Sequence, residues 1–319
     1  MTLPHEDPAL EKLAHVDASV RRLAVIDLAD LEDEDYLPAL ARVLREDPDA
    51  VVRAEAARVL AGWDHRDTVE ALAAALLDED AGVRDTAAHS LSELKDPEVA
   101  RALLPFARHA TPSVRAAALR ALRELRLPEA ADAAREALEH RDPAVRREAI
   151  SVLGWLRLES AVPALMQRVA SDPDVEVRRV ATGALGYADS KVLPALLGAL
   201  SDAAWSVREE AATTLAKLRP PAALDALCAA LEDDYWQVRL RAARALGRIR
   251  DPAAVPTLLL ALAHEVGNLR KEVALALGEI ADPRSQAALE TATDDQDPEV
   301  RKAARIALSQ LATRAARAP

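Results

Sequence analysis

The chain contains few residues of several types, and each shortage excludes a class of protein. Its 319 residues include one cysteine, nine glycines and only 3% aromatic residues. A single cysteine excludes an intramolecular disulfide framework. The sequence has no apolar run near the ~20 residues of a transmembrane helix, and its start, MTLPHEDPALEK, lacks the basic and apolar regions of a signal peptide. We therefore expect a cytoplasmic protein without a membrane partner.

Charge and motif content also exclude several functions. The formal net charge is -12 and the pI is about 5.2, which disfavours binding to a phosphate backbone. Cys228 lies among Leu227, Ala229 and Leu231, a setting that predicts a buried, inert thiol. No phosphate-binding glycine loop, nucleophile elbow, CxxC pair or HExxH stretch occurs. We therefore expect no catalytic residue, no cofactor and no metal, and interpret the protein as a non-enzyme.

An arginine, nine times preceded by valine and once by Leu269, recurs every 30 to 32 residues. A period of this length is typical of a helical hairpin that must stack on its neighbours to bury its apolar face. We therefore predict ten repeats in a single domain over 1–319, with the repeats over 5–311 and a polar, frayed tail over 312–319. The ten arginines are Arg21, Arg53, Arg84, Arg115, Arg146, Arg178, Arg208, Arg239, Arg270 and Arg301.

Each repeat is predicted to form two helices, called helix A and helix B. The third residue after the arginine is small or apolar and the seventh is leucine, which places both on one face of helix B. Helix A is expected over about twenty residues and helix B over about ten from the arginine onward. Ala204 and Val266 should leave repeats 7 and 9 uncapped, and repeat 9 is predicted to be the softest joint. The expected N-caps are Asp17, Asp49, Asp80, Thr111, Asp142, Asp174, Asp234 and Asp297.

The segments DPAVRREAISVLG (142–154) and DDYWQVRLRAARALG (233–247) resemble HEAT repeats, specifically the short bacterial form of the phycobilisome-lyase-like group. The resemblance covers residues 5–311 and implies an all-α, right-handed α-solenoid (superhelix) of about ten HEAT-like hairpins. It also implies a ladder between repeats, formed by each arginine and by an aspartate six residues before an arginine. The matching residues are Asp78, Asp202, Asp233 and Asp295, whereas His15, His109, His140 and His264 stand at the same position.

The four histidines at one repeat position suggest a metal site. Equivalent atoms of neighbouring hairpins lie about 8 to 10 Å apart, too far to share one zinc ion with Zn–N distances of about 2.0 to 2.1 Å. We therefore interpret these histidines as bonding the ladder or capping the turn. A metal-binding or pH-sensing role is the alternative.

Enzymes built from HEAT repeats offer two comparisons. Deoxyhypusine hydroxylases hold iron with His-Glu pairs in a V-R-H-E-A context, and this chain keeps Glu55, Glu148 and Glu210 in that context without the histidines. These glutamates are interpreted as solvated residues of the helix face. HEAT-like alkylpurine DNA glycosylases need a cationic concave surface, which the acidic net charge disfavours.

Glycine follows leucine near the end of helix B in four repeats. These glycines are interpreted as allowing close helix packing or as ending helix B; they are Gly154, Gly186, Gly247 and Gly278.

Two surfaces are candidates for binding a partner. Positions 1, 2, 5 and 9 after each arginine should line the concave surface of the B helices, and in repeats 5 to 8 they carry aromatic and basic residues, which are enriched at interface hot spots. These are Arg147, Trp155, Arg179, Tyr187, Lys217, Arg241, Arg244 and Arg248. The second surface is the edge formed by the A–B turns, where Trp205, Tyr235 and Trp236 lie among acidic residues and could dock a basic peptide or a partner helix. The alternative is that the aromatic residues cover joints between hairpins and that the arginines are solvated.

These observations predict a non-catalytic scaffold or adaptor that binds another protein or peptide through the concave B-helix face. The first alternative is an accessory or maturation factor resembling bilin lyase subunits, although no residue marks a tetrapyrrole pocket. A third possibility is nucleic-acid binding through Arg241, Arg244 and Arg248. The partner, the oligomeric state and the choice between the two surfaces remain open.

Overall fold

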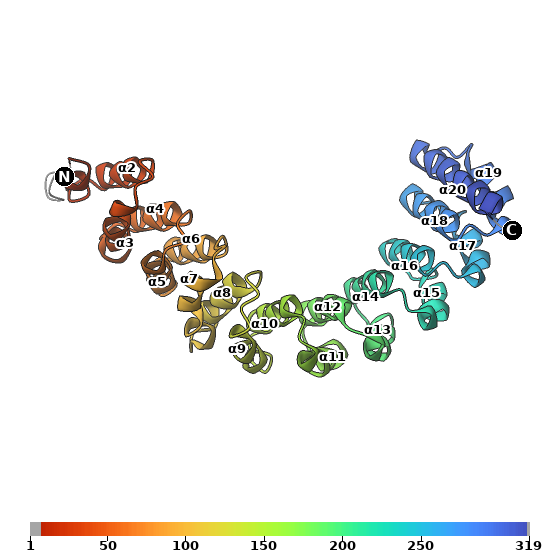
Figure 1. Cartoon of the computed structure of the whole chain (residues 1–319), viewed down its shortest axis with the longest axis horizontal. Coiled ribbons are helices and arrows are strands. Elements are labelled where there is room, and N and C mark those ends of the chain that lie inside the picture. The colour runs from red at the N-terminus through yellow and green to blue at the C-terminus, as the bar shows by residue number, and fades with distance from the viewer. Residues whose placement is uncertain (1–7, 318–319) are drawn as a thin grey trace. The chain divides into compact units, whose positions relative to one another are not determined.

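The computed structural model describes residues 8–317, and all regular structure in that range is helical (Figure 1). A short helix A and a longer helix B alternate along the chain, so the predicted α-solenoid and its ten hairpins are confirmed for the described residues. The hairpins pair α1 (Pro8–Lys12) with α2 (Ala18–Ala29), α3 (Leu37–Glu46) with α4 (Ala50–Leu60), α5 (Arg66–Ala75) with α6 (Ala81–Leu91), α7 (Pro97–Ala100) with α8 (Pro112–Leu122), α9 (Ala130–Ala137) with α10 (Pro143–Leu156), α11 (Val162–Ser171) with α12 (Val175–Ala184), α13 (Leu193–Ala199) with α14 (Trp205–Leu218), α15 (Leu224–Ala230) with α16 (Trp236–Ile249), α17 (Val255–Ala261) with α18 (Gly267–Ile280), and α19 (Gln286–Ala292) with α20 (Pro298–Arg317).

The hairpins group into two compact parts, residues 1–156 and 157–319, and each is described by itself. In the first part, consecutive B helices α2, α4, α6, α8 and α10 pack against one another. In the second part, α12, α14, α16, α18 and α20 do the same. A single domain over 1–319 stays a prediction. Within residues 8–317, no helix has the length and apolar character needed to span a bilayer.

The helix lengths differ from those expected. Helix B begins three residues before the repeat arginine and runs for 10 to 14 residues in most repeats, whereas helix A has only 7 to 10 residues in most. A 3-10 turn often precedes helix A, as at Ser190–Val192 and Pro252–Ala254. Pro163, Pro194 and Pro256 lie in the first turn of helix A, where a missing amide hydrogen breaks no helical bond.

Most helix B caps follow the prediction, with two exceptions. The side chains of Asp49 and Asp174, for example, accept hydrogen bonds from first-turn amides. The prediction for Asp234 is wrong, because Tyr235 is the N-cap of α16 and its side chain makes no capping bond. Thr111 also makes none. Ala204 and Val266 leave α14 and α18 without a side-chain cap, as predicted.

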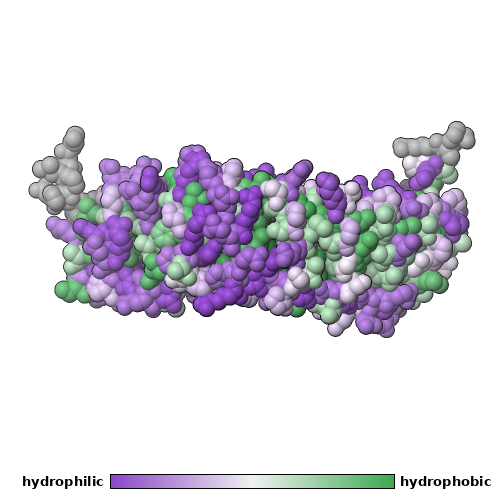
Figure 2. Space-filling view, turned by 90° about the horizontal axis from the view of Figure 1, so that it is seen from below, coloured by the Kyte–Doolittle hydropathy of each residue, from purple (hydrophilic) through white to green (hydrophobic). Residues whose placement is uncertain are grey.

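The core is built from small aliphatic residues at fixed repeat positions. The alanine or valine three residues after each arginine is at most 1% exposed, from Ala24 to Ala304. The leucine seven residues after the arginine is buried in every repeat except the last, where Leu308 is half-exposed. Alanine allows helices to approach closely, so few aromatic residues are needed to fill the core. The face seen in Figure 2 carries mostly polar residues with apolar residues between them.

Two of the LG glycines mark close helix packing. A Cβ on Gly247 would lie 2.8 Å from the Cα of Ala276, and a Cβ on Gly278 would lie 2.6 Å from the Cα of Ala307. Helix B does not end at these glycines. Helices α16 and α18 continue to Ile249 and Ile280, and they end where the next residue, Arg250 or Ala281, takes a left-handed conformation.

The C-terminal tail is helical over its described residues. Helix α20 continues to Arg317, and Arg314 donates a hydrogen bond of 2.8 Å to the carbonyl of Ile280. Residues 312–317 are therefore helical, and fraying of the tail stays a prediction. Residues 318–319, like 1–7, lie outside the described range.

Candidate protein-binding surfaces

Arginine–aspartate pairs join consecutive A–B turns, which confirms the predicted ladder. In a complete rung the arginine of one repeat binds the aspartate of the next. Arg53 donates through Nε and Nη2 to both oxygens of Asp78 at 2.8 Å, and its Nη1 donates to the carbonyl of Asp47 in its own turn at 2.8 Å. Complete rungs include Arg21–Asp47, Arg53–Asp78, Arg178–Asp202, Arg208–Asp233 and Arg270–Asp295. Asp47 has the same six-residue spacing and was missed in the sequence.

The rungs hold their carboxylates in the charged form. The hydrogen bond from Arg53 lowers the pKa of Asp78, and burial opposes this effect. At Asp47 burial is the largest single effect and raises the pKa, but the hydrogen bonds from Arg21 and the Asp49 amide, with the charges of Arg21 and Arg53, act in the other direction and the pKa is lowered overall. The ladder is therefore intact at neutral pH and fixes the turn edge of each part.

The histidines at the ladder position cap their own turns. The Nδ1 atoms of His109 and His140 accept hydrogen bonds from amides two residues further on, at 3.1 and 3.0 Å. In complete rungs an aspartate oxygen accepts the same bond, as Asp78 does from the Asp80 amide. The prediction that the histidines cap the turn is confirmed. Within residues 8–317, no group of three or more His, Cys, Asp or Glu side chains is placed to hold a metal ion.

The arginines that precede these histidines lack the aspartate of a complete rung. Arg84 donates through Nη1 to two carbonyls of its own turn, those of Asp78 and Glu79. The Nε of Arg115 is buried and has no hydrogen-bond acceptor. Arg239 donates its Nε to the carbonyl of Asp233. A histidine therefore preserves the turn but leaves the preceding arginine without a carboxylate.

Arginines on the B-helix face lie over more deeply buried glutamates of neighbouring repeats. Arg244 donates through Nε and Nη2 to Glu272 at 2.7 and 2.8 Å, and its side chain is 44% exposed against 12% for the glutamate. Arg241 donates to Glu209 at 2.9 Å. Looser pairs join Arg179 to Glu210 at 3.8 Å and Arg248 to Glu279 at 3.9 Å. The guanidinium groups are therefore the outer layer of this face, and the carboxylates orient them.

The interpretation of Glu55, Glu148 and Glu210 as solvated residues is wrong. Glu55 is only 7% exposed and is paired with Arg22 and Arg58. Glu148 and Glu210 are also largely covered, and Glu148 accepts a bond of 3.0 Å from Arg120. These glutamates are acceptors for arginines of the preceding repeat, because equivalent faces of successive B helices lie side by side.

The predicted site residues fall into both parts of the chain. Arg147 and Trp155 lie on α10 in residues 1–156, where Trp155 is 40% exposed and the guanidinium carbon of Arg126 lies 5.6 Å from its ring centroid. Tyr187 and Lys217 lie in residues 157–319, where Lys217 is exposed. Because each part is described by itself, the predicted adjacency of Trp155 and Tyr187 stays a prediction.

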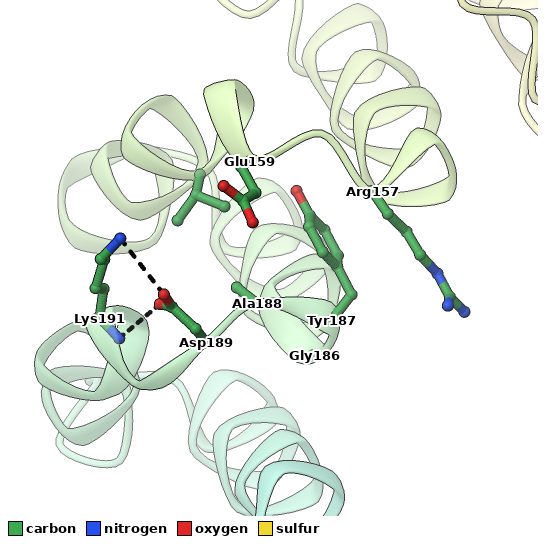
Figure 3. A pocket seen from close by; sticks show the side chains of 8 residues that line it. Arg157, Glu159, Gly186, Tyr187, Ala188, Asp189 and Lys191 are labelled. Atoms are coloured by element: carbon green, nitrogen blue, oxygen red, sulfur yellow. Dashed lines mark hydrogen bonds and ion pairs between the residues drawn. The ribbon is translucent and has the colours of Figure 1, made fainter.

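Tyr187 lines a polar hollow of about 450 Å³ in the second part (Figure 3). Its hydroxyl donates to the carbonyl of Leu158 at 3.0 Å, and burial raises the pKa of the phenol. Glu159 lies near the ring, and Lys191 pairs with Asp189 at 3.4 Å on one side of the hollow. The phenol thus joins the end of helix B to the linker that leads into α11, so Tyr187 covers a joint, which is the alternative role considered for this residue.

The aromatic residues of the turn edge form a stack. The rings of Trp205 and Tyr235 are 5.6 Å apart and inclined by 16°, and the guanidinium of Arg208 lies 5.7 Å from the Tyr235 centroid. Tyr235 is exposed, and Trp236 is half-buried as the first residue of α16. Because Arg208 also pairs with Asp233, the stack is attached to a complete ladder rung.

Cys228 lies half-buried on α15, less enclosed than predicted. Burial raises the pKa of its thiol, with a smaller opposing effect from Thr257. The raised pKa keeps the thiol protonated, and a protonated thiol is a poor nucleophile.

Stacked helical hairpins joined by an arginine–aspartate ladder define a helical repeat protein. The description "HEAT repeats" matches residues 37–113, 100–186, 162–238 and 225–309, and the chain belongs to this family. A search of curated proteins finds no match.

Solved structures share the fold at low sequence identity. Importin beta matches at 17% identity with a TM-score of 0.63, over 95% of this chain and 50% of that one. Kap95p, in a structure that describes its binding to RanGDP, matches at 15% identity with a TM-score of 0.61, over 97% of this chain and 51% of that one. An engineered protein matches at 23% identity with a TM-score of 0.50, over 95% of this chain and 98% of that one. The chain thus spans about half of the two importin-type chains.

Proposed function

We propose that this protein is a non-catalytic scaffold that binds another protein or peptide in the cytoplasm. The binding surface is the arginine face, defined as Arg179, Tyr187, Lys217, Arg241, Arg244 and Arg248 on the B-helix side of residues 157–319. The observation that carries the proposal is the layering of this face, in which each guanidinium group pairs with a glutamate that is less exposed than the arginine.

This layering favours binding to a polypeptide. A guanidinium held by a carboxylate loses less side-chain entropy when it contacts a partner. Arginine is also enriched among residues that dominate interface energies. Kap95p and Kap121p, which share the fold, are described in complexes with RanGDP and Nup53p. These complexes support a similar use of stacked hairpins here.

The same layering disfavours nucleic-acid binding. Arg241, Arg244 and Arg248 each have a glutamate within 4 Å, so each pair contributes little net positive charge. Binding to a phosphate backbone depends on such uncompensated charge.

A role like that of bilin lyase subunits would require the phycobilisome-lyase-like subtype. An absorbing pigment that co-purifies with the protein would favour that alternative.

The test is affinity capture from the native host with an R241A/R248A variant. These arginines are suitable because their partners Glu209 and Glu279 keep 26% and 29% of their side-chain surface exposed. The Oε2 atom of Glu279 is already buried without a hydrogen-bond partner, so removing Arg248 breaks no hydrogen bond there. The control is R66A/R284A, which removes the same charge from side chains that are 75% and 56% exposed. We expect the captured partner to be lost with the first variant and retained with the control. Retention by both variants at unchanged helicity would exclude the arginine face.

A further inference from the structure

We propose that Arg84 and Arg115 form incomplete ladder rungs that bind carboxylate groups of an acidic segment in a partner protein. This inference rests on the proposed protein-binding function and adds a second surface, in residues 1–156. Each incomplete rung consists of an arginine and the histidine that stands in the aspartate position of the next repeat. The two rungs are Arg84 with His109 and Arg115 with His140.

The complete rungs show which ligand these arginines are built to hold. In the same part of the chain, Arg21 and Arg53 each bind both oxygens of one carboxylate at 2.7 to 2.8 Å. Such two-point pairs of guanidinium and carboxylate have strict geometry and are stronger than neutral hydrogen bonds. The repeat places Arg84 and Arg115 at the equivalent position of α6 and α8.

The incomplete rungs leave donors without a carboxylate. The buried Nε of Arg115 has no acceptor, and a buried, unpaired donor is unfavourable. Arg84 uses Nη1 for carbonyls of its own turn, as complete rungs also do. The histidines cannot replace the carboxylate, because their Nδ1 atoms already accept amides of their own turns. The ring of His109 also stacks near Phe106, with centroids 6.4 Å apart.

The charge of the turn edge changes sign at these rungs. Turns 46–51 and 77–82 carry six carboxylates against the two rung arginines Arg21 and Arg53, which gives a formal charge of -4. Turns 108–113 and 139–144, together with Glu136, which pairs with Arg108 at 3.0 Å, carry three carboxylates and two arginines, and Arg84 and Arg115 bring the formal charge to +1. An acidic segment would therefore be attracted to this stretch and repelled by its neighbour.

The spacing of the rungs sets the spacing of the acidic residues. Packed helices lie about 8 to 10 Å apart, and a polyproline II segment rises about 3.1 Å per residue with three residues per turn. In that conformation acidic residues three positions apart lie on one face and would reach consecutive rungs. The partner segment is one with Asp or Glu at that spacing.

The experiment measures binding of a fluorescein-labelled peptide, GSEGSEGSEGS, to the full chain by fluorescence anisotropy at low ionic strength. The same peptide with Gln at each Glu position is the ligand control. The informative variant is H109D/H140D, which completes both rungs from within the chain. We expect this variant to bind the Glu peptide at least about tenfold more weakly than the unaltered chain, because its arginines are occupied.

The matched control is H15D/H65D, which makes the same chemical change at two histidines that also accept an amide through Nδ1. His15 lies in the first repeat and His65 lies outside the ladder position, so neither follows a rung arginine. This control should bind the peptide within about threefold of the unaltered chain. Equal weakening by both variants, equal binding of the Gln peptide, or no binding to the unaltered chain would overturn the proposal. The R241A/R248A variant should bind the peptide normally, which separates failure of this proposal from failure of the arginine face.

Discussion

Replacing His140 with Asp should stabilise the protein by completing a ladder rung. The new carboxylate would stand where Asp47 and Asp78 stand in complete rungs, with one oxygen accepting the amide of Asp142 in place of Nδ1. Its second oxygen would face the guanidinium of Arg115, whose Nε now lacks an acceptor. The substitution therefore preserves the turn and adds an interaction between repeats.

The size of the gain follows from two opposing terms. A hydrogen bond to a charged group contributes about 1.5 to 3 kcal/mol, and an unsatisfied buried donor costs about 1 to 3 kcal/mol. Removing the new carboxylate from water offsets part of this gain. Because Arg115 is only half-buried, we expect a net gain of about 1 to 2 kcal/mol. For a part of this size that corresponds to a rise in melting temperature of about 2 to 8 °C.

The assay is urea unfolding followed by circular dichroism, with a double-mutant cycle between H140D and R115A. The control H15D adds the same charge in the first repeat, where no rung arginine precedes it. We expect H140D to be more stable than H15D and the gain to vanish in the R115A background. Equal stability of the two variants, or a coupling energy of zero, would refute the ladder reasoning.

Three further predictions concern helix packing, helix ends and pH. G278A should destabilise the protein by about 1 to 3 kcal/mol because its Cβ would meet the backbone of α20, whereas G198A, with nothing within 4 Å, should stabilise α13 in the same unfolding assay. R250G should raise stability by about 0.5 to 1 kcal/mol, because φ is 63° at this position; a loss would show that the side chain contributes more than the strain. The pKa of Asp78 is lowered from 3.8 by its pairing with Arg53, so the pair stabilises the fold above that pH and this stabilisation is lost as the pH falls through the lower pKa of the folded state. D78N should therefore weaken the pH dependence of the unfolding free energy between about pH 2 and pH 5. An unchanged dependence would show that the Arg53–Asp78 pair does not stabilise the fold.

The fold could be predicted from the sequence because one period determines it. The arginine spacing located all ten hairpins, and the buried Ala and Leu positions follow from helical geometry. Helix lengths were less predictable, since the 3-10 turns before helix A depend on how each linker packs. The cap at Tyr235 was missed because an aspartate, Asp234, stands one residue earlier.

The candidate site was only partly predictable. The sequence identified the arginines of the B-helix face, but it gave no sign that Arg244 lies over Glu272 or that Glu55 is buried. These pairs join residues in different repeats, about 28 to 33 positions apart, and depend on the register between helices. The six-residue spacing from Asp47 to Arg53 was a usable signal that was overlooked. The spacing also marked His109 and His140, although only the structure shows the unpaired Nε of Arg115.

The central claim is that the arginine face contacts another protein. The most direct measurement places a photo-crosslinking amino acid at position 248 and, as control, at the exposed position 284 in the native host. We predict protein adducts from position 248 that are absent from position 284. Adducts to nucleic acid alone, or the same protein adducts from both positions, would contradict the claim.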